Sequence, residues 1–126
     1  MSWRWRLPGK RDIRVRRIYD DPNDEDGIRV LVDSLWPRGV SKVRADIDEW
    51  CAAVAPSDAL RKWYGHAPER FEDFESRYLR ELEDPKRAAA VAHLRTVASR
   101  GRLTLLTATR DAESSQAAIL AALLRC

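Results

Sequence analysis

Cysteine is scarce in this sequence. Only Cys51 and Cys126 occur among the 126 residues; they do not form a CxxC pair, and no cluster of histidines accompanies them. This pattern supports neither a disulfide framework nor a zinc site. We therefore expect two free thiols, no bound metal and no cofactor.

Long hydrophobic runs are missing as well. No stretch approaches the ~18 consecutive apolar residues of a membrane-spanning helix. The basic start of the chain is not followed by the ~7 to 15 apolar residues of a secretory signal peptide. We expect a cytoplasmic protein that has no membrane partner.

The familiar catalytic and nucleotide-binding motifs are also absent. The sequence has no nucleophile elbow, phosphate-binding P-loop, glycine-rich dinucleotide loop or set of metal ligands. Cys51 is followed by Ala52, Ala53 and Val54, which favours a buried thiol over a reactive one. The absence of these motifs leaves open whether the protein is an enzyme.

Positive charge is concentrated near the N-terminus. Residues 1–20 contain seven Arg or Lys against two Asp, whereas the rest of the chain contains sixteen against eighteen acids. The total length suits one domain. We predict a basic, flexible arm over residues 1–12 and a single domain over residues 13–126. Trp3 and Trp5 lie between cations in the arm, a combination that suits phosphate contact and base stacking.

Three segments have the pattern of β-strands. Residues 13–19 alternate apolar and basic side chains, which is typical of an edge strand. Residues 28–33 and 102–109 are nearly continuous apolar runs, as expected of interior strands covered on both faces. Residues 20–27 are rich in acids and turn formers, which predicts a solvated loop.

Four segments have the caps or the apolar spacing of helices. Ser57 and Asp84 are suitable N-caps, and Pro85 suits a first helical turn. Residues 46–54 are compatible with either a helix or a strand. The helical segments are residues 56–64, 68–83, 84–101 and 111–125, and the second has the clearest stripe, Phe71, Phe74, Tyr78 and Leu82.

The alternation of helices with β-rich runs predicts an α/β fold, in which a small, mostly parallel β-sheet is flanked by helices within a single domain. Ligands of such sheets bind beyond the carboxyl ends of the strands. Two chemically dense segments follow predicted strands, residues 33–42 and residues 107–116. We expect these two segments to lie at the same end of the sheet.

The first of these segments should be stiff. Pro37 fixes its own backbone and restricts Trp36 to an extended shape, while Gly39 permits a left-handed or close-approach conformation. A stiff loop would aim Arg38 and Lys42 in fixed directions, and their charges suit a phosphate or carboxylate. Trp36 would then provide an aromatic wall.

Several motifs occur in order along the chain. They are V30-L-V-D-S-L-W-P-R-G-V-S-K42, D48-E-W50, A55-P-S57, L60-R-K-W-Y-G-H66 and L103-T-L-L-T-A-T-R-D111. Over nearly all of residues 13–125 the chain resembles the YeaO-like family of bacterial proteins, a domain of unknown function. The resemblance implies a small cytoplasmic α/β domain. The positions that match the family's motifs are Asp33, Leu35, Trp36, Pro37, Arg38, Gly39, Lys42, Trp50, Pro56, Ser57, Leu60, Arg61, Trp63 and His66.

The chain departs from the family pattern in two places. The family often has arginine where this chain has Ser34, and it often has His or Asn after the last strand, where this chain has Ser114, Ser115 and Gln116. The resemblance therefore does not imply any activity that needs an imidazole at that junction.

We interpret these residues as a site for a small anionic or nucleotide-like ligand. Asp33 and His66 are the candidate acid–base groups, because an imidazole exchanges protons near neutral pH and a neighbouring carboxylate can share that role. The candidate ligand contacts are Trp36, Arg38, Lys42, Arg61, Trp63 and Arg110.

Other interpretations stay open. Asp33 could simply pair with Arg38 or Arg61, and the tryptophans could be core residues. A nucleic-acid-binding module would use the basic N-terminus together with Arg14, Arg16 and Arg17, although the rest of the chain is slightly acidic. An interaction adaptor without catalysis is the third possibility.

Overall fold

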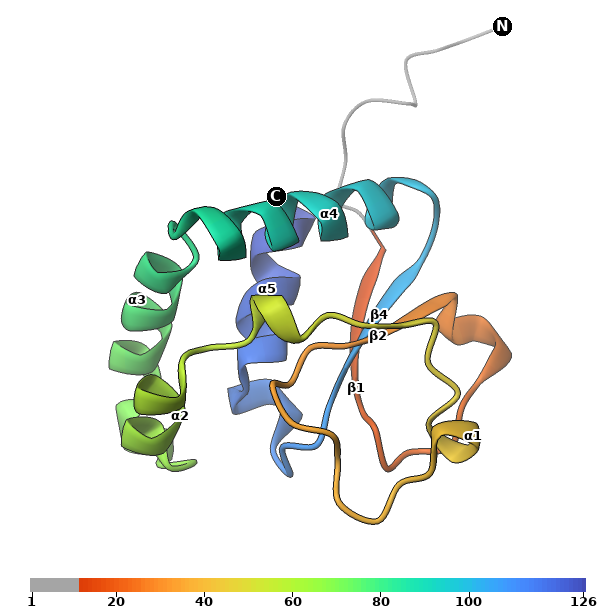
Figure 1. The fold of residues 1–126 in the computed structure, drawn as a ribbon, viewed down its shortest axis with the longest axis horizontal. Coiled ribbons are helices and arrows are strands. Elements are labelled where there is room, and N and C mark those ends of the chain that lie inside the picture. Colours follow the sequence, from red (N-terminus) through yellow and green to blue (C-terminus); the bar gives the residue numbers. More distant parts are fainter. Residues whose placement is uncertain (1–11) are drawn as a thin grey trace, which may run out of the picture.

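The structure, a computed structural model, describes residues 12–126, and the predicted basic arm lies outside this range apart from Asp12. Four strands form one sheet in the described chain, in the order β1-β4-β2-β3, and every pairing is parallel (Figure 1). This confirms the predicted α/β class. The strands are β1 Ile13–Arg17, β2 Ile28–Leu31, β3 Glu49–Trp50 and β4 Leu103–Thr107.

The two continuous apolar runs form the interior of the sheet. Leu105 of β4 pairs with Val15 of β1 on one side and with Val30 of β2 on the other. The alternating basic segment forms the edge strand β1, as its pattern predicts. Because β2 and β4 run parallel, the segments that leave them begin at the same end of the sheet.

The helices cover the two faces of the sheet unequally. The larger core cluster packs Val30 and Leu105 against side chains from α2, α3, α4 and α5. A smaller cluster on the other face joins Leu31 and Leu106 to the chain that follows β2. Figure 1 shows α3, α4 and α5 gathered on one side and α1 apart from them. The helices are α1 Lys42–Ala45, α2 Asp58–Tyr64, α3 Phe71–Glu81, α4 Pro85–Ser99 and α5 Gln116–Arg125.

Helix positions follow from caps and apolar spacing. The Ser57 hydroxyl accepts a hydrogen bond from the Leu60 N–H and begins α2, and the Asp84 carboxylate caps α4 in the same way. In α3, Phe74 and Tyr78 are buried one turn apart, because residues four positions apart lie on one helical face. The predicted helices at these positions are confirmed.

Two segments divide into shorter pieces. The ambiguous residues 46–54 contain both kinds of structure, the two-residue strand β3 and a single 3₁₀ turn at Ala52–Val54. After β4, a 3₁₀ turn at Ala112–Ser114 precedes α5, so the helix begins at Gln116. The chain between β4 and α5 is therefore a loop at the end of the sheet.

The prediction that residues 20–27 are solvated is wrong at Asp26, which is 1% exposed. Its carboxylate accepts hydrogen bonds from Arg16 and from Arg29, a buried residue of the interior strand β2. Burial by itself would raise the pKa of Asp26, but hydrogen bonds from the Asn23 N–H and both arginines outweigh it and hold that pKa below its usual value. An unpaired buried guanidinium would be strongly destabilising, so the ion pair with Arg29 favours the conformation in which this part of the loop is buried.

Candidate functional site

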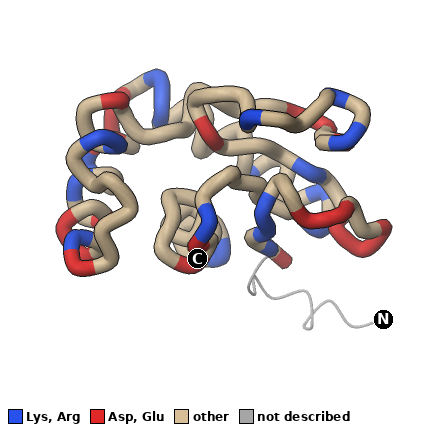
Figure 2. Tube along the Cα trace, turned by 90° about the horizontal axis from the view of Figure 1, so that it is seen from below, with Lys and Arg blue, Asp and Glu red and all other residues tan. Residues whose placement is uncertain are grey.

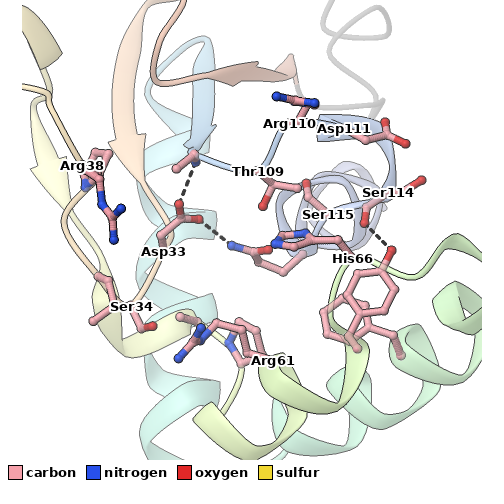
Figure 3. Close-up of a pocket in the computed structure, with 18 of the residues that line it drawn as sticks. Asp33, Ser34, Arg38, Arg61, His66, Thr109, Arg110, Asp111, Ser114 and Ser115 are labelled. Carbon is pink, nitrogen blue, oxygen red and sulfur yellow. Dashed lines mark hydrogen bonds between the residues drawn. The ribbon is translucent and has the colours of Figure 1, made fainter.

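A cavity of about 670 Å³ lies where the chain leaves the carboxyl ends of the strands. One wall is the loop that follows β2, residues 33–38, and the facing wall is the junction that follows β4, residues 108–116. Arg61 from α2 and His66 from the turn after it lie at the rim (Figure 3), and Tyr64 of α2 also lines the cavity. The two loops therefore share one end of the sheet, as predicted.

The loop after β2 is held by hydrogen bonds to its backbone. The Trp36 indole N–H donates to the Val40 carbonyl over 2.7 Å, and the Tyr19 hydroxyl donates to the Arg38 carbonyl over 3.0 Å. Gly39 adopts a positive φ of 76°, a conformation that glycine takes at little cost. The loop has the predicted constraints, and Arg38 leaves it as an exposed side chain.

Asp33 ties the two walls together. Its Oδ1 accepts hydrogen bonds from the Thr107 hydroxyl (2.8 Å) and the Gln116 amide (2.6 Å), and its Oδ2 accepts one from the Ala108 N–H (2.7 Å). Burial raises the pKa of Asp33, although these three hydrogen bonds and the charge of His66 act in the opposite direction. The carboxylate is thus partly desolvated and faces the cavity.

The alternative in which Asp33 pairs with an arginine is wrong for the described residues. Within residues 12–126 no lysine or arginine lies within 4.0 Å of its carboxylate oxygens. Backbone and neutral side chains satisfy Asp33 instead, so Arg38 and Arg61 are not needed to neutralise it.

Three arginines from three separate segments line the cavity. Arg38 comes from the loop after β2, Arg61 from α2, and Arg110 from the junction after β4, and Figure 3 shows them on different sides of Asp33. Arg61 makes only an exposed contact of 3.4 Å with Asp58. Among the described residues, the side chains of Arg38 and Arg110 have no acidic partner within 4.0 Å.

His66 sits at the rim in an unusual backbone conformation. Its φ is 58°, directly after Gly65 at 53°, so two left-handed residues in succession end α2 and turn the chain. The imidazole is exposed, lines the cavity and lies near the Tyr64 ring, with centroids 6.4 Å apart. The Tyr64 hydroxyl in turn donates to the Ser114 carbonyl, which links the rim to the facing wall.

The structure does not bring two of the predicted contacts to the cavity. Lys42 is the first residue of α1 and lies beyond the loop wall. Trp63 instead packs against two guanidinium groups. The centroid of its ring lies 4.1 Å from the guanidinium carbon of Arg77 and 5.3 Å from that of Arg70. The cavity is instead lined by Trp36, Arg38, Arg61 and Arg110 together with Asp33 and His66.

Sequence reasoning missed Gln116 and Tyr19 as parts of this site. Gln116 lies at the first position of α5, and its amide reaches Asp33, while Tyr19 lies just after β1 and braces the loop. The sequence placed both residues near the ends of predicted elements, but it did not show that Gln116 would bind Asp33 or that Tyr19 would bind the Arg38 carbonyl. Cys51 is buried, and burial together with Glu49 raises the pKa of its thiol, so it is a poor nucleophile.

Two further observations concern only residues 12–126. In that range no group of three or more His, Cys, Asp or Glu side chains is arranged to hold a metal ion. None of the helices there is both long and apolar enough to cross a bilayer.

Comparisons with known proteins place the chain among uncharacterised relatives. A family model described as the inactive DUF488-N3 subclade matches residues 12–126. An uncharacterised protein of Mycobacterium tuberculosis H37Rv is 50% identical over 112 residues, covering 89% of this chain and 92% of the relative. The uncharacterised protein YeaO of Escherichia coli K12 is 35% identical over 114 residues, covering 90% and 97%. No solved structure matches the chain at a significant level.

Proposed function

This chain belongs to the YeaO-like DUF488-N3 family, and from its structure we propose that it binds a small anionic ligand in the cavity at the carboxyl end of its sheet, without catalysing a reaction. The cavity has the size of ligand sites in general, roughly 300 to 1,000 Å³. Its position beyond the strand ends is where open α/β sheets bind ligands.

The observation that carries this proposal is the convergence of Arg38, Arg61 and Arg110 on one cavity. The three guanidinium groups outnumber the two carboxylates that also line the cavity, those of Asp33 and Asp111, so the lining attracts an anion. Arginine also offers a planar set of donors that fits phosphate and carboxylate oxygens. The weak pairing of these side chains within the described chain leaves them available for a ligand.

Two features favour binding over catalysis. The carboxylate of Asp33 already accepts three hydrogen bonds from residues of the fold, so it serves to join the two walls and is poorly suited to take a proton from a substrate. Within residues 12–126 no hydrogen bond orients the ring of His66, whereas a catalytic imidazole is normally held by a second group. The word inactive in the description of the matching subclade agrees with this view.

Nucleic-acid binding receives less support from the described part of the chain. Arg16 pairs with buried Asp26, and Arg17 donates to the Thr109 carbonyl, so two of the basic strand residues serve the fold. Figure 2 shows basic and acidic positions interspersed along the trace. An electrostatic footprint for nucleic acid would instead gather one sign on one face.

The proposal is tested by calorimetric titration and thermal shift with phosphate, pyrophosphate, nucleoside monophosphates and a short oligonucleotide. A ligand present at 100 times its dissociation constant should stabilise the protein by about 2.7 kcal/mol. Arg61→Ala and Arg110→Ala should each weaken binding about tenfold or more, the equivalent of one charge-assisted hydrogen bond.

Arg100→Ala is the matched control, because Arg100 is also exposed but precedes β4 at the other end of the sheet. Equal losses in all three variants would mean that only net charge matters and would contradict a site. Binding of the oligonucleotide alone would favour the nucleic-acid function.

A further inference from the structure

We propose that the ligand is a nucleoside phosphate, with its phosphate among the arginines and an N–H of its base donated to Asp33. This inference rests on the proposed function and adds the chemical class of the ligand. It assigns Asp33 as the residue that distinguishes a nucleotide from a simple phosphate.

The hydrogen-bond capacity of Asp33 is the first argument. A carboxylate has about four acceptor positions, two on each oxygen. The fold fills both positions of Oδ1, with Thr107 and Gln116, and one position of Oδ2, with the Ala108 N–H. One position on Oδ2 is left for a donor, and Asp33 lines the cavity.

The charges in the cavity are the second argument. An ionised carboxylate beside the arginines repels a compact anion that brings mainly acceptor oxygens. A ligand avoids this repulsion when it carries a negative group at one end and an N–H donor at the other. The three arginines surround Asp33 from separate segments (Figure 3), so both ends of such a ligand find a partner.

The size and the aromatic residues of the cavity are the third argument. About 670 Å³ exceeds what a single phosphate or a free amino acid fills. Tyr19 and Trp36 are among the residues that line the cavity, and their hydrogen bonds to the Arg38 and Val40 carbonyls fix both side chains. The Arg17 guanidinium lies over the Tyr19 ring and Trp50 packs edge-on against Trp36, so a base would stack on what these neighbours leave open. Pre-positioned aromatic rings suit the planar face of a base, since stacking does not depend on which base is present.

The experiment compares nucleoside monophosphates with ribose 5-phosphate, which has the sugar and phosphate but no base. Both are titrated into the full chain by calorimetry at neutral pH. We expect the best nucleotide to bind the wild-type protein about tenfold more tightly than ribose 5-phosphate, since a hydrogen bond to a charged group contributes at least that factor.

Asp33→Asn then separates recognition from a structural role. The substitution replaces one carboxylate oxygen by an amide NH₂ group, which cannot accept a hydrogen bond from a base. If Asp33 reads the base, the variant loses affinity for the nucleotide more than for ribose 5-phosphate, and the preference falls below about threefold. If Asp33 only holds the walls together, both affinities fall by the same factor and the inference is overturned.

Asp73→Asn is the control, because it makes the same change of charge on the exposed surface of α3. It should leave the preference for the nucleotide unchanged. If Asp33→Asn fails to fold, purine riboside 5′-monophosphate, whose base has no N–H donor, is titrated into the wild-type protein instead, and an affinity equal to that of the nucleotide overturns the inference. A nucleotide that binds no more tightly than ribose 5-phosphate overturns the inference and leaves the anion site standing, whereas no binding of any phosphate overturns both.

Discussion

Replacing Gly27 by alanine should strongly destabilise the protein, because this glycine meets two constraints at once. Its φ of 67° and ψ of −133° lie in a region that side chains other than glycine rarely adopt. A Cβ atom there would lie 2.4 Å from the Arg102 carbonyl oxygen and 2.9 Å from the Arg102 Cβ. That carbonyl accepts the Ile28 N–H over 2.9 Å, so it cannot retreat without breaking a hydrogen bond at the start of β2.

Backbone strain of this kind costs roughly 1 to 3 kcal/mol, and overpacking adds a similar amount. We therefore expect Gly27→Ala to lower the free energy of unfolding by roughly 2 to 6 kcal/mol, much of the 5 to 15 kcal/mol of a typical domain. Urea unfolding followed by tryptophan fluorescence measures this loss as a shift of the midpoint at constant slope.

Gly39→Ala is the matched comparison. Gly39 also has a positive φ, but no atom lies within 4 Å of the position of its Cβ, so only backbone strain of about 1 to 2 kcal/mol should appear. Equal losses in the two variants would show that the contact with Arg102 is relieved at no cost, and the reasoning from close packing would be refuted.

Three further perturbations test the core, the site and the buried ion pair. Phe74→Ala should cost roughly 3 to 5 kcal/mol, because Phe74 is 2% exposed and stacks on Tyr64 at 4.2 Å; an unchanged melting temperature would contradict its place in the core. Arg38→Ala should weaken pyrophosphate binding at least about tenfold in calorimetry while the free energy of unfolding changes by under about 0.5 kcal/mol, since the side chain is exposed; a loss of several kcal/mol would assign it to the fold. Asp26→Asn should cost roughly 3 to 5 kcal/mol at pH 7, because it leaves buried Arg29 without its carboxylate. The pKa of Asp26 is lowered in the folded protein, so its ionised form contributes its full stabilisation at pH values above the ordinary pKa of 3.8. This stabilisation is lost as the pH falls through the pKa of the folded protein. Urea unfolding at pH 7, 4 and 2.5 should therefore show that the difference in unfolding free energy between wild type and Asp26→Asn becomes smaller as the pH falls.

The parallel sheet and the location of the site could be predicted because they depend on periodicity and on chain direction. The apolar runs at residues 28–33 and 102–109 had the composition of covered strands, and parallel strands that both lead into polar loops place those loops at one end. The stiffness of the loop around Pro37 and Gly39 could also be predicted, because it depends on the covalent geometry of these two residues.

The direction of individual side chains could not be predicted, since it depends on neighbours that are distant in the sequence. Trp63 turns toward Arg77 of α3 instead of the cavity, and Lys42 is carried away by the helix that Ser41 caps. The burial of Asp26 was hidden inside an acidic loop, because only the folded sheet places Arg29 beside it.

The place of β1 in the sheet has a consequence for how the protein is made. In the described sheet its one neighbour is β4, and Ile13 pairs with Leu103, so the first of the described strands meets its partner only after the last of them has left the ribosome. Until then the alternating basic segment has no strand to pair with, and contacts between such distant segments form slowly. We expect the nascent domain to stay incomplete until β4 emerges, and the sheet and the cavity at its end to close only after that point.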